Sequence, residues 1–387
     1  LPGYTLDLPK PIYADDVKKF IFSGVAGNQK GFIFWQYRPE VLGRETPTWG
    51  LTYLDGEETS WLDAYADCGK VLQKNADFIL NAKPKKAEVA ILYNPENQIF
   101  SWASTGNEKT ATDSLLGFHR ALYERNYIVD FIHPIEFEKN ILKNYKVLVI
   151  PFPYVLNKKI AGKIVNWVKN GGVLLTESYT AGWNIEKGHH EKVVPGYGLD
   201  KIYKVKQAVV KPDADGNVKI ILDQDLPYLK KGSEVYGSIV KETFINNGAS
   251  IIASFDSGEP AIFLSKFGNG RAIQIGSYIG LKFHREKIEN NGNLISGLIE
   301  STTKISKPII TDNKKVRVDV LSSEEKKLVI VQNIESKNVN VSVQIPGEKF
   351  LIMVEQFSGE KIICKKIKSG VEFKLKLNPR EVKVYRA

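Results

Sequence analysis

The sequence predicts an α/β protein built from three consecutive regions, residues 1–84, 85–301 and 302–387. Three observations support this division. The middle of the chain alternates short apolar runs with amphipathic helical segments. An apolar run near the N-terminus is too short for a helix and is apolar on both faces. The C-terminal region alternates apolar and polar residues at period two, which is typical of half-buried strands.

The first region has the predicted order helix, strand, loop, helix. Its first helix follows a proline-punctuated opening and has one apolar face at i, i+3, i+4 spacing, made of Val17, Phe20, Ile21, Gly24 and Val25. Residues 31–36 predict a strand buried on both sides. A polar loop over 37–58 then leads to a second helix, which begins at the capping-box-like pair Ser60 and Asp63. The inner face predicted for this helix is Trp61, Ala64, Cys68, Val71, Leu72 and Ile79.

A single strand that is buried on both faces cannot exist alone. Its backbone groups need hydrogen-bond partners, and its two edges need neighbouring strands. Residues 1–84 are therefore predicted to be the last piece of a larger parallel β/α structure whose other strands come from elsewhere.

The second region predicts a doubly wound parallel sheet. Strands are expected at 89–93, 127–132, 147–151 and 173–176, with helices at 112–124 and 158–169, the latter ended by Gly171-Gly172. A mixed insertion is expected at about 178–259. Strands at 261–264 and 271–275 and a helix at 287–300 then complete the unit.

The third region predicts a small antiparallel sandwich or barrel without helices, and it carries most of the net charge of +10. Residues 301–387 hold 18 Lys and Arg against 10 Asp and Glu. Such a bias can attract nucleic acid. The charges alternate with apolar residues, as in Phe373-Lys374-Leu375-Lys376-Leu377, so the pattern favours lysine-faced strands that resist edge aggregation over a nucleic-acid site.

Several kinds of chemistry are disfavoured. Tyr93-Asn94-Pro95-Glu96 follows the first strand of the doubly wound region, where a dinucleotide site would need a Gly-x-Gly-x-x-Gly turn. No Gly-x-Ser-x-Gly elbow is present, and the five histidines lack metal-ligand spacing, so no cofactor or metal is expected. Cys68 and Cys364 each lie in an apolar pattern and predict buried free thiols in a reducing, cytosol-like setting. No run reaches the ~18 apolar residues of a membrane helix.

The loop after the predicted doubly buried strand combines aromatic and charged residues. It includes Trp35, Arg38, Glu40, Glu45 and Trp49. Carbohydrate is one interpretation, because pyranose rings stack on tryptophan and their hydroxyls bind carboxylates, and the carboxyl ends of barrel strands carry active sites. The other interpretation is structural: Trp35 belongs to the core, Arg38 pairs with Glu40, and Trp49 covers the rim.

The same loop carries a resemblance to a known family. The motif Phe34-Trp35-Gln36-Tyr37-Arg38, followed by Gly43-Arg44-Glu45, Gly50-Leu51 and Asp55-Gly56, resembles the eighth-strand region of glycoside hydrolase family 42, the β-galactosidase-like enzymes. Leu1-Pro2-Gly3 resembles the segment that follows the nucleophile glutamate of that family. The resemblance implies the C-terminal fragment of a TIM (β/α)8 barrel, then a flavodoxin-like trimerisation domain, then a small antiparallel β domain.

The resemblance also implies roles for individual residues. Glu45 matches the glutamate that binds galactose hydroxyls, while Trp35 and Arg38 match residues of the pocket floor. Thr48, beside Trp49, stands where the family often has a sugar-binding histidine, so galactose specificity is not carried over. The substrate-binding residues are thus expected to be Trp35, Arg38, Glu45, Thr48 and Trp49.

The catalytic carboxylates are not expected in this chain. A retaining glycosidase needs two carboxylates roughly 5–5.5 Å apart. Glu40 and Glu45 share one loop, without opposed strands to fix their separation. In the family the pair lies on earlier strands, so the resemblance implies an N-terminal barrel half as partner, a homo-oligomer (a trimer) and a β-galactoside-like carbohydrate as ligand. The alternatives are a non-catalytic oligomerisation or carbohydrate-binding protein and a polyanion binder that uses the basic C-terminal region.

Overall fold

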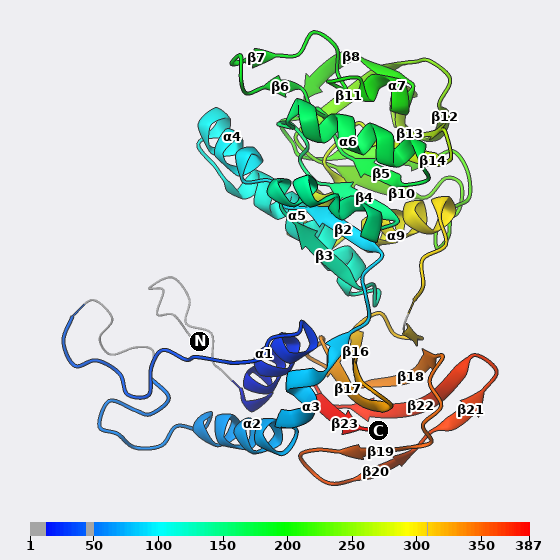
Figure 1. Cartoon of the computed structure of the whole chain (residues 1–387). Coiled ribbons are helices and arrows are strands. Elements are labelled where there is room, and N and C mark those ends of the chain that lie inside the picture. Colours follow the sequence, from blue (N-terminus) through cyan, green and yellow to red (C-terminus); the bar gives the residue numbers. More distant parts are fainter. Residues whose placement is uncertain (1–12, 44–49, 308) are drawn as a thin grey trace. The chain divides into compact units, whose positions relative to one another are not determined.

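The computed structural model describes residues 13–43, 50–307 and 309–387, and the chain divides into two compact units (Figure 1). The sandwich unit combines residues 1–86 with residues 307–387. The central unit comprises residues 87–306. None of the helices in the described ranges is both long enough and apolar enough to cross a membrane.

The central unit is built on a nine-stranded sheet of order β10-β9-β12-β13-β14-β5-β4-β2-β3. The strands are β2 (Val89–Leu92), β3 (Val129–Ile132), β4 (Val147–Ile150), β5 (Val173–Thr176), β9 (Val218–Leu222), β10 (Glu234–Gly237), β12 (Ser250–Phe255), β13 (Pro260–Phe267) and β14 (Gly270–Ile275). Strands β14, β5, β4, β2 and β3 are mutually parallel, and the other four extend the sheet in antiparallel fashion. Residues 178–259, predicted as an insertion, therefore contribute β9, β10 and β12 to the main sheet.

Two small ribbons accompany this sheet. The first pairs β8 (Val205–Pro212) with β11 (Val240–Asn246), and the second pairs β6 (Trp183–Asn184) with β7 (His189–His190).

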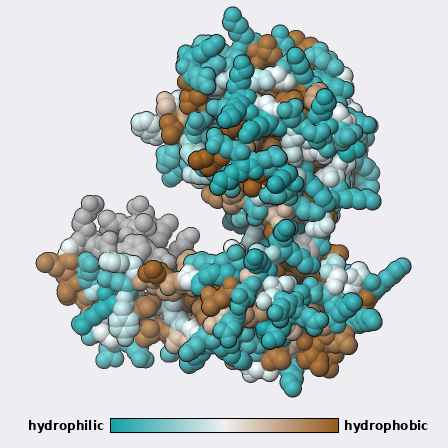
Figure 2. All heavy atoms as spheres, viewed as in Figure 1, coloured by the Kyte–Doolittle hydropathy of each residue, from teal (hydrophilic) through white to brown (hydrophobic). Residues whose placement is uncertain are grey.

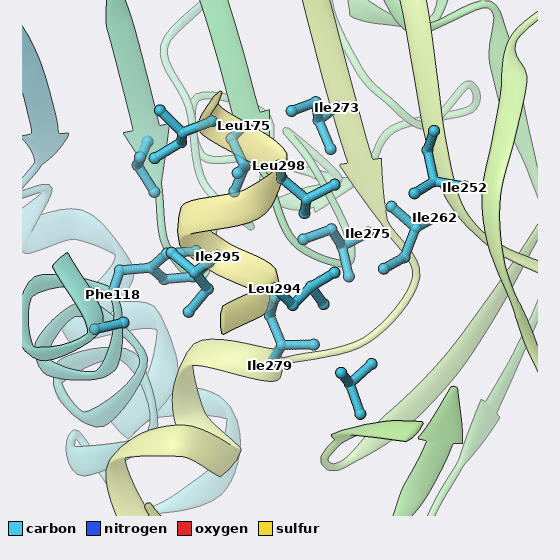
Figure 3. Packing of buried hydrophobic residues seen from close by; sticks show 14 of the residues in the cluster. Phe118, Leu175, Ile252, Ile262, Ile273, Ile275, Ile279, Leu294, Ile295 and Leu298 are labelled. Atoms are coloured by element: carbon cyan, nitrogen blue, oxygen red, sulfur yellow. The ribbon is translucent and has the colours of Figure 1, made fainter. Parts of the chain in front are cut away.

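Helices cover both faces of the central sheet. One apolar cluster joins the sheet to α5 (Lys109–Tyr123), α8 (Ile279–Glu286) and α9 (Glu289–Thr302). Figure 3 shows this cluster, in which Leu294 and Leu298 of α9 lie beside Ile273, Ile275 and Leu175 of the strands. The opposite face packs against α6 (Lys158–Lys169), α7 (Leu199–Tyr203) and the 3-10 helices η1 (Pro134–Lys139) and η2 (Ile141–Asn144). The sheet is thus covered on both sides, as its continuously apolar parallel strands require.

The sandwich unit contains two packed antiparallel sheets, formed by residues 310–386 together with the short strand β1. One has the order β1-β16-β17-β23-β19-β20 and the other β15-β18-β22-β21. The strands are β1 (Lys83–Pro84), β15 (Ile310–Thr311), β16 (Val316–Ser323), β17 (Lys326–Asn333), β18 (Val339–Pro346), β19 (Ile352–Glu355), β20 (Lys361–Ile363), β21 (Lys365–Ile367), β22 (Gly370–Leu377) and β23 (Val382–Arg386). On β22 the lysines at 374 and 376 are exposed, while Phe373, Leu375 and Leu377 are buried, as the period-two pattern predicts.

Three helices pack on the outer face of the larger sheet of this sandwich. They are α1 (Ala14–Ala26), α2 (Leu62–Lys74) and α3 (Ala76–Asn81). Their apolar side chains form one core with Leu321, Leu328, Ile330, Val382 and Val384 of the strands. Successive residues of β17 therefore face two different cores, which explains why β17 is buried on both sides.

Some local predictions for these helices are wrong. Phe20 was expected on the inner face of α1, but it is 57 % exposed, and Phe22 is fully buried against Phe357 instead. The helix α2 is capped at Trp61 without a side-chain hydrogen bond, so Ser60 does not form the predicted capping box. Both cysteines are buried and unpaired, as predicted, and burial raises the pKa of the Cys68 thiol to about 12.

Residues 31–36 do not form the predicted strand. No described segment pairs with them, and Ile33 is fully exposed. The physical reason is that a doubly buried strand forms only where neighbouring strands pair with its edges and other elements cover both of its faces, and no described segment pairs with residues 31–36.

Candidate carbohydrate loop and its surroundings

The segment that carries the predicted sugar-binding residues folds back on itself at both ends. The backbone N–H of Leu51 donates to the carbonyls of Gln36 (3.0 Å) and Tyr37 (2.9 Å), and the N–H of Thr52 donates to that of Tyr37 (3.0 Å). Pro39 lies directly against Gly50, where an added Cβ would come within 2.3 Å of the proline ring. These contacts bring residues 36–39 and 50–52 together, so the intervening loop begins and ends at one place.

The structure places two of the five predicted site residues. The Trp35 side chain is 60 % exposed, which contradicts the interpretation in which Trp35 is core. The Arg38 guanidinium donates through Nε and Nη2 to the carbonyl of Leu54, both at 3.1 Å. Among the described residues, Arg38 makes no ion pair with Glu40. Glu45, Thr48 and Trp49 lie outside the described residues.

The turn over residues 53–57, whose Leu54 carbonyl accepts from Arg38, is closed by its own hydrogen bonds. Tyr53 and Glu57 close it through a 2.8 Å backbone hydrogen bond, and the N–H of Gly56 donates to Tyr53. The indole N–H of Trp61 donates to the carbonyl of Gly50 at 3.4 Å, which ties the loop to the start of α2. Arg38 therefore links the start of the loop to the turn that follows its end; we call this contact the Arg38 bracket.

An apolar groove of 390 Å³ lies beside this loop. Its walls come from α1, residues 31–34, α2 and α3, and they include Val25, Phe32, Phe34, Tyr65, Leu72 and Ile79. Figure 2 shows hydrophobic side chains on the visible surface around α1. The lining has few polar groups that could orient a sugar, so the groove suits apolar protein side chains better than a carbohydrate.

The central unit holds two buried acids that the sequence did not single out. Glu177, directly after β5, accepts hydrogen bonds from the Ser114 hydroxyl and from the backbone N–H groups of Phe152 (3.2 Å) and Gly280 (2.8 Å). Glu242, on β11, accepts from the Gln207 amide (2.6 Å) and the Tyr179 N–H (2.8 Å). Burial raises the pKa of each carboxyl to about 7, against the opposing effect of these hydrogen bonds.

These acids hold the carboxyl edge of the sheet together. Glu177 ties the end of β5 to α5, to the loop that follows β4 and to α8. No sequence motif marks Glu177 or Glu242, and both lie more than 100 residues from the loop around Trp35, so the sequence did not indicate their role. Among the described residues, no group of three or more His, Cys, Asp or Glu side chains could hold a metal ion.

Comparison with known proteins identifies relatives along most of the chain. The β-galactosidase LacZ of Lactobacillus acidophilus is 25% identical over 346 residues, covering 87% of this chain and 48% of that protein. The β-galactosidase BgaB of a Geobacillus species is 23% identical over 356 residues, covering 89% of this chain and 48% of its own length. The chain thus spans about half the length of these curated relatives.

Solved structures show the same fold. The β-galactosidase from Bacillus circulans sp. alkalophilus superposes with a TM-score of 0.80 at 20% identity, covering 99% of this chain and 53% of that one. The β-galactosidase from the haloarchaeon Halorubrum lacusprofundi gives a TM-score of 0.69 at 15% identity, covering 98% and 51%.

A family model decides the assignment. The model described as the β-galactosidase trimerisation domain matches residues 87–303, which is more than half of the chain and coincides with the central unit. The chain therefore belongs to the β-galactosidase family known as glycoside hydrolase family 42, and its resemblance to the C-terminal half of such an enzyme is confirmed.

Proposed function

We propose that this chain serves as the C-terminal half of a β-galactosidase-like retaining glycoside hydrolase. In this proposal it supplies the last part of a (β/α)8 barrel, part of the sugar pocket and the trimer-forming, flavodoxin-like central unit. An N-terminal half, as a separate chain or a connected segment, supplies the remaining barrel strands and the two catalytic carboxylates.

The observation that carries the proposal is the incomplete core around residues 31–36. This apolar segment has no strand partner among the described residues, Ile33 is fully exposed, and the 390 Å³ groove beside it is lined by aromatic and aliphatic side chains. Exposed apolar surface of this extent is typical of an interaction site. Further barrel strands and helices would pair with the segment and fill the groove.

Within the completed barrel, the chemistry of this chain would be recognition. The exposed Trp35 ring offers a face for a pyranose, and the Arg38 bracket fixes the ends of the loop that holds Glu45, Thr48 and Trp49. A carboxylate at Glu45 would accept hydrogen bonds from sugar hydroxyls. In the completed enzyme, Glu45→Gln should weaken sugar binding by about 1–3 kcal/mol, the scale for a charged hydrogen bond.

Reconstitution tests this function. The purified chain is expected to be inactive on p-nitrophenyl β-galactoside, and addition of an N-terminal barrel half from the same source should restore hydrolysis and give a stable complex. Ile33→Asp should weaken that complex, because it places a charge where the strands meet. The matched control is Ile363→Asp, which changes another highly exposed isoleucine, on β20 (82 % exposed). Hydrolysis by the chain alone, or equal effects of both substitutions, would overturn the proposal.

The second candidate is a non-catalytic oligomerisation or carbohydrate-binding protein. The match of the central unit to a trimerisation domain favours it, because that unit forms a complete core on its own. A stable, saccharide-binding oligomer that no N-terminal half activates would establish this alternative.

A further inference from the structure

The parallel part of the central sheet has a topological switch point between β2 and β4. The order β3-β2-β4-β5-β14 means that the chain leaves β2 toward one edge and leaves β4 toward the other. In doubly wound sheets, ligands bind outside the carboxyl ends of the strands at this point. The residues that follow β2 and β4 are therefore the first place to look for a ligand site outside the barrel loop.

The loop after β4 is locked in place there by two buried asparagines. The Asn94 amide donates to the carbonyl of Val155 at 3.0 Å, and the Asn97 side-chain oxygen accepts from the N–H of Val155 at 2.7 Å. This clamp holds the Tyr154 ring parallel to Phe100 of α4 (Pro95–Thr105), with ring centroids 4.6 Å apart. Tyr154 is thus presented in a fixed orientation.

Three more rings extend this surface. Measured between ring centroids, Tyr179 lies 4.5 Å from Tyr154, and Trp183 lies 5.3 Å from Phe100. The His190 ring lies edge-on to Tyr154 and Tyr179, with centroid distances of 6.0 and 6.1 Å. We call Phe100, Tyr154, Tyr179, Trp183 and His190 the aromatic platform. All five residues are partly or fully exposed.

Polar groups on the aromatic platform are available to a ligand. Within the described parts of the chain, the hydroxyls of Tyr154 and Tyr179 and the indole N–H of Trp183 make no hydrogen bond, and none of these three atoms is a buried orphan. Rings that offer an apolar face and a free polar edge are well suited to a ligand that is apolar on one side and hydroxylated at its rim.

The groups next to the platform do not favour an anionic ligand. Glu242 accepts the backbone N–H of Tyr179, and Glu177 accepts that of Phe152, which stacks between Tyr154 and Tyr278. The platform itself contains no lysine or arginine, and the turn after β2 contains Pro95 where a phosphate-binding loop would have glycines. Phosphorylated ligands are therefore disfavoured, whereas a neutral ligand is not.

We propose that the aromatic platform is a binding site for a neutral saccharide, separate from the barrel loop. A pyranose ring stacks on the exposed aromatic faces, while its hydroxyl groups bind the Tyr154 and Tyr179 hydroxyls and the Trp183 N–H. The site belongs entirely to the central unit, so it goes beyond the proposed function and does not depend on an N-terminal half.

A titration of the whole purified chain with lactose, with binding measured by saturation-transfer NMR, tests this site. Trp183→Ala should weaken lactose binding about tenfold by removing a stacking ring and a donor. Tyr154→Phe, which keeps the ring and its packing on Phe100, should weaken binding roughly fivefold through the lost hydroxyl. The control Trp102→Ala removes a tryptophan that is 61 % exposed on α4, the helix that carries Phe100, but lies outside the platform; it should have no effect on lactose binding.

Each other outcome overturns the site. The site is wrong if lactose fails to bind the wild-type chain, or if both platform variants bind lactose as tightly as the wild type does. Binding that is lost in Trp35→Ala and kept in Trp183→Ala belongs to the barrel loop. A platform variant that changes the native mass, with no lactose binding by the wild type, identifies a subunit contact. Since reconstitution is read by hydrolysis, failure of this site and failure of the proposed function are distinguished.

Discussion

Glu177 and Glu242 face the same physical conflict at the scale of single side chains. Each is completely buried, and neither forms an ion pair with a cation in the described ranges. Desolvation therefore raises the pKa of both carboxyls to about 7, although backbone and side-chain donors favour the charged form. A proton taken up on folding is the consequence.

This proton makes the stability of the central unit depend on pH. The folded pKa is about 7 and the ordinary value is 4.5, so between these values the folded state binds more protons than the unfolded state. Stability contributed by each carboxyl should fall as pH rises through this window, by at most about 3 kcal/mol. Glu242→Gln should flatten this decline, because an amide does not titrate. The variant should still fold, since the amide can accept from the Tyr179 N–H and donate to Gln207. Denaturant unfolding at pH 4.5 and pH 7.5 measures the change in stability of wild type and variant.

A control with the opposite sign is available. Glu259 pairs with Lys241 at 3.0 Å, and hydrogen bonds together with this lysine lower the pKa of its carboxyl to about 2. Its stabilisation is present above the unfolded pKa of 4.5 and is lost as pH falls toward 2, so Glu259→Gln should lower stability at neutral pH, and its difference from wild type should vanish at acid pH. An identical pH profile for wild type and Glu242→Gln would contradict the role of the buried acid.

Two phenylalanines of α1 should differ sharply in their effect on stability. Phe22 is fully buried and contacts Phe357 edge-on, with ring centroids 5.7 Å apart, whereas Phe20 is 57 % exposed. Phe22→Ala should destabilise the sandwich unit by about 3–5 kcal/mol through the cavity it leaves. Phe20→Ala should cost less than about 0.5 kcal/mol, as for other surface positions. Urea unfolding of both variants decides, and comparable losses would show that α1 is rotated from the orientation described.

At the scale of elements, local patterns were sufficient wherever an element is continuous and strongly periodic. The strand 173–176 and the helix 158–169 have the predicted bounds, because each is delimited by glycines or by a capping asparagine at 157. The strands 89–93 and 147–151 were each predicted one residue too long. Amphipathic period and turn residues carry this information within a few neighbours.

Elements that depend on distant partners could not be predicted in this way. Strands β9, β10 and β12 join the sheet only through the chain of pairings from β14 to β13 to β12 to β9, which spans more than 50 residues. The helix α4 was missed because its outer residues Ile99 and Trp102 are apolar but exposed, although Asn94 caps it and Pro95 occupies its first turn. For residues 31–36 the pattern indicates a strand, but no described segment pairs with them.

The crossing of α5 and α8 depends on two glycines. A Cβ added at Gly117 would lie 1.8 Å from the carbonyl oxygen of Gly280, and this oxygen belongs to the backbone and cannot move aside. Gly117→Ala should therefore destabilise the central unit by about 3 kcal/mol or more. Gly162→Ala, on α6 with open space around it, should instead stabilise it by about 0.5–1 kcal/mol. Thermal unfolding compares the two, and a neutral Gly117→Ala would disprove the close helix contact.

On the scale of the whole molecule, the two units differ in how they complete their cores. The central unit covers both faces of its sheet with helices from residues 87–306 alone. The sandwich unit needs two distant segments, because α1, α2 and α3 cover the outer face of the sheet formed by the C-terminal strands. Residues 307–387 by themselves would leave Leu321, Leu328, Ile330 and Val384 uncovered.

The two units should consequently behave differently when separated. A fragment of residues 87–306 should fold cooperatively and self-associate with the mass of a trimer, because it holds a complete core and matches a trimerisation domain. A fragment of residues 307–387 should aggregate, since an exposed apolar sheet face of this kind promotes association, and adding residues 13–86 should rescue it. Circular dichroism and light scattering coupled to gel filtration measure both outcomes. A monomeric 87–306 fragment would show that self-association needs residues of the sandwich unit, and a stable monomeric 307–387 fragment would show that the α1–α3 layer is dispensable for that sheet.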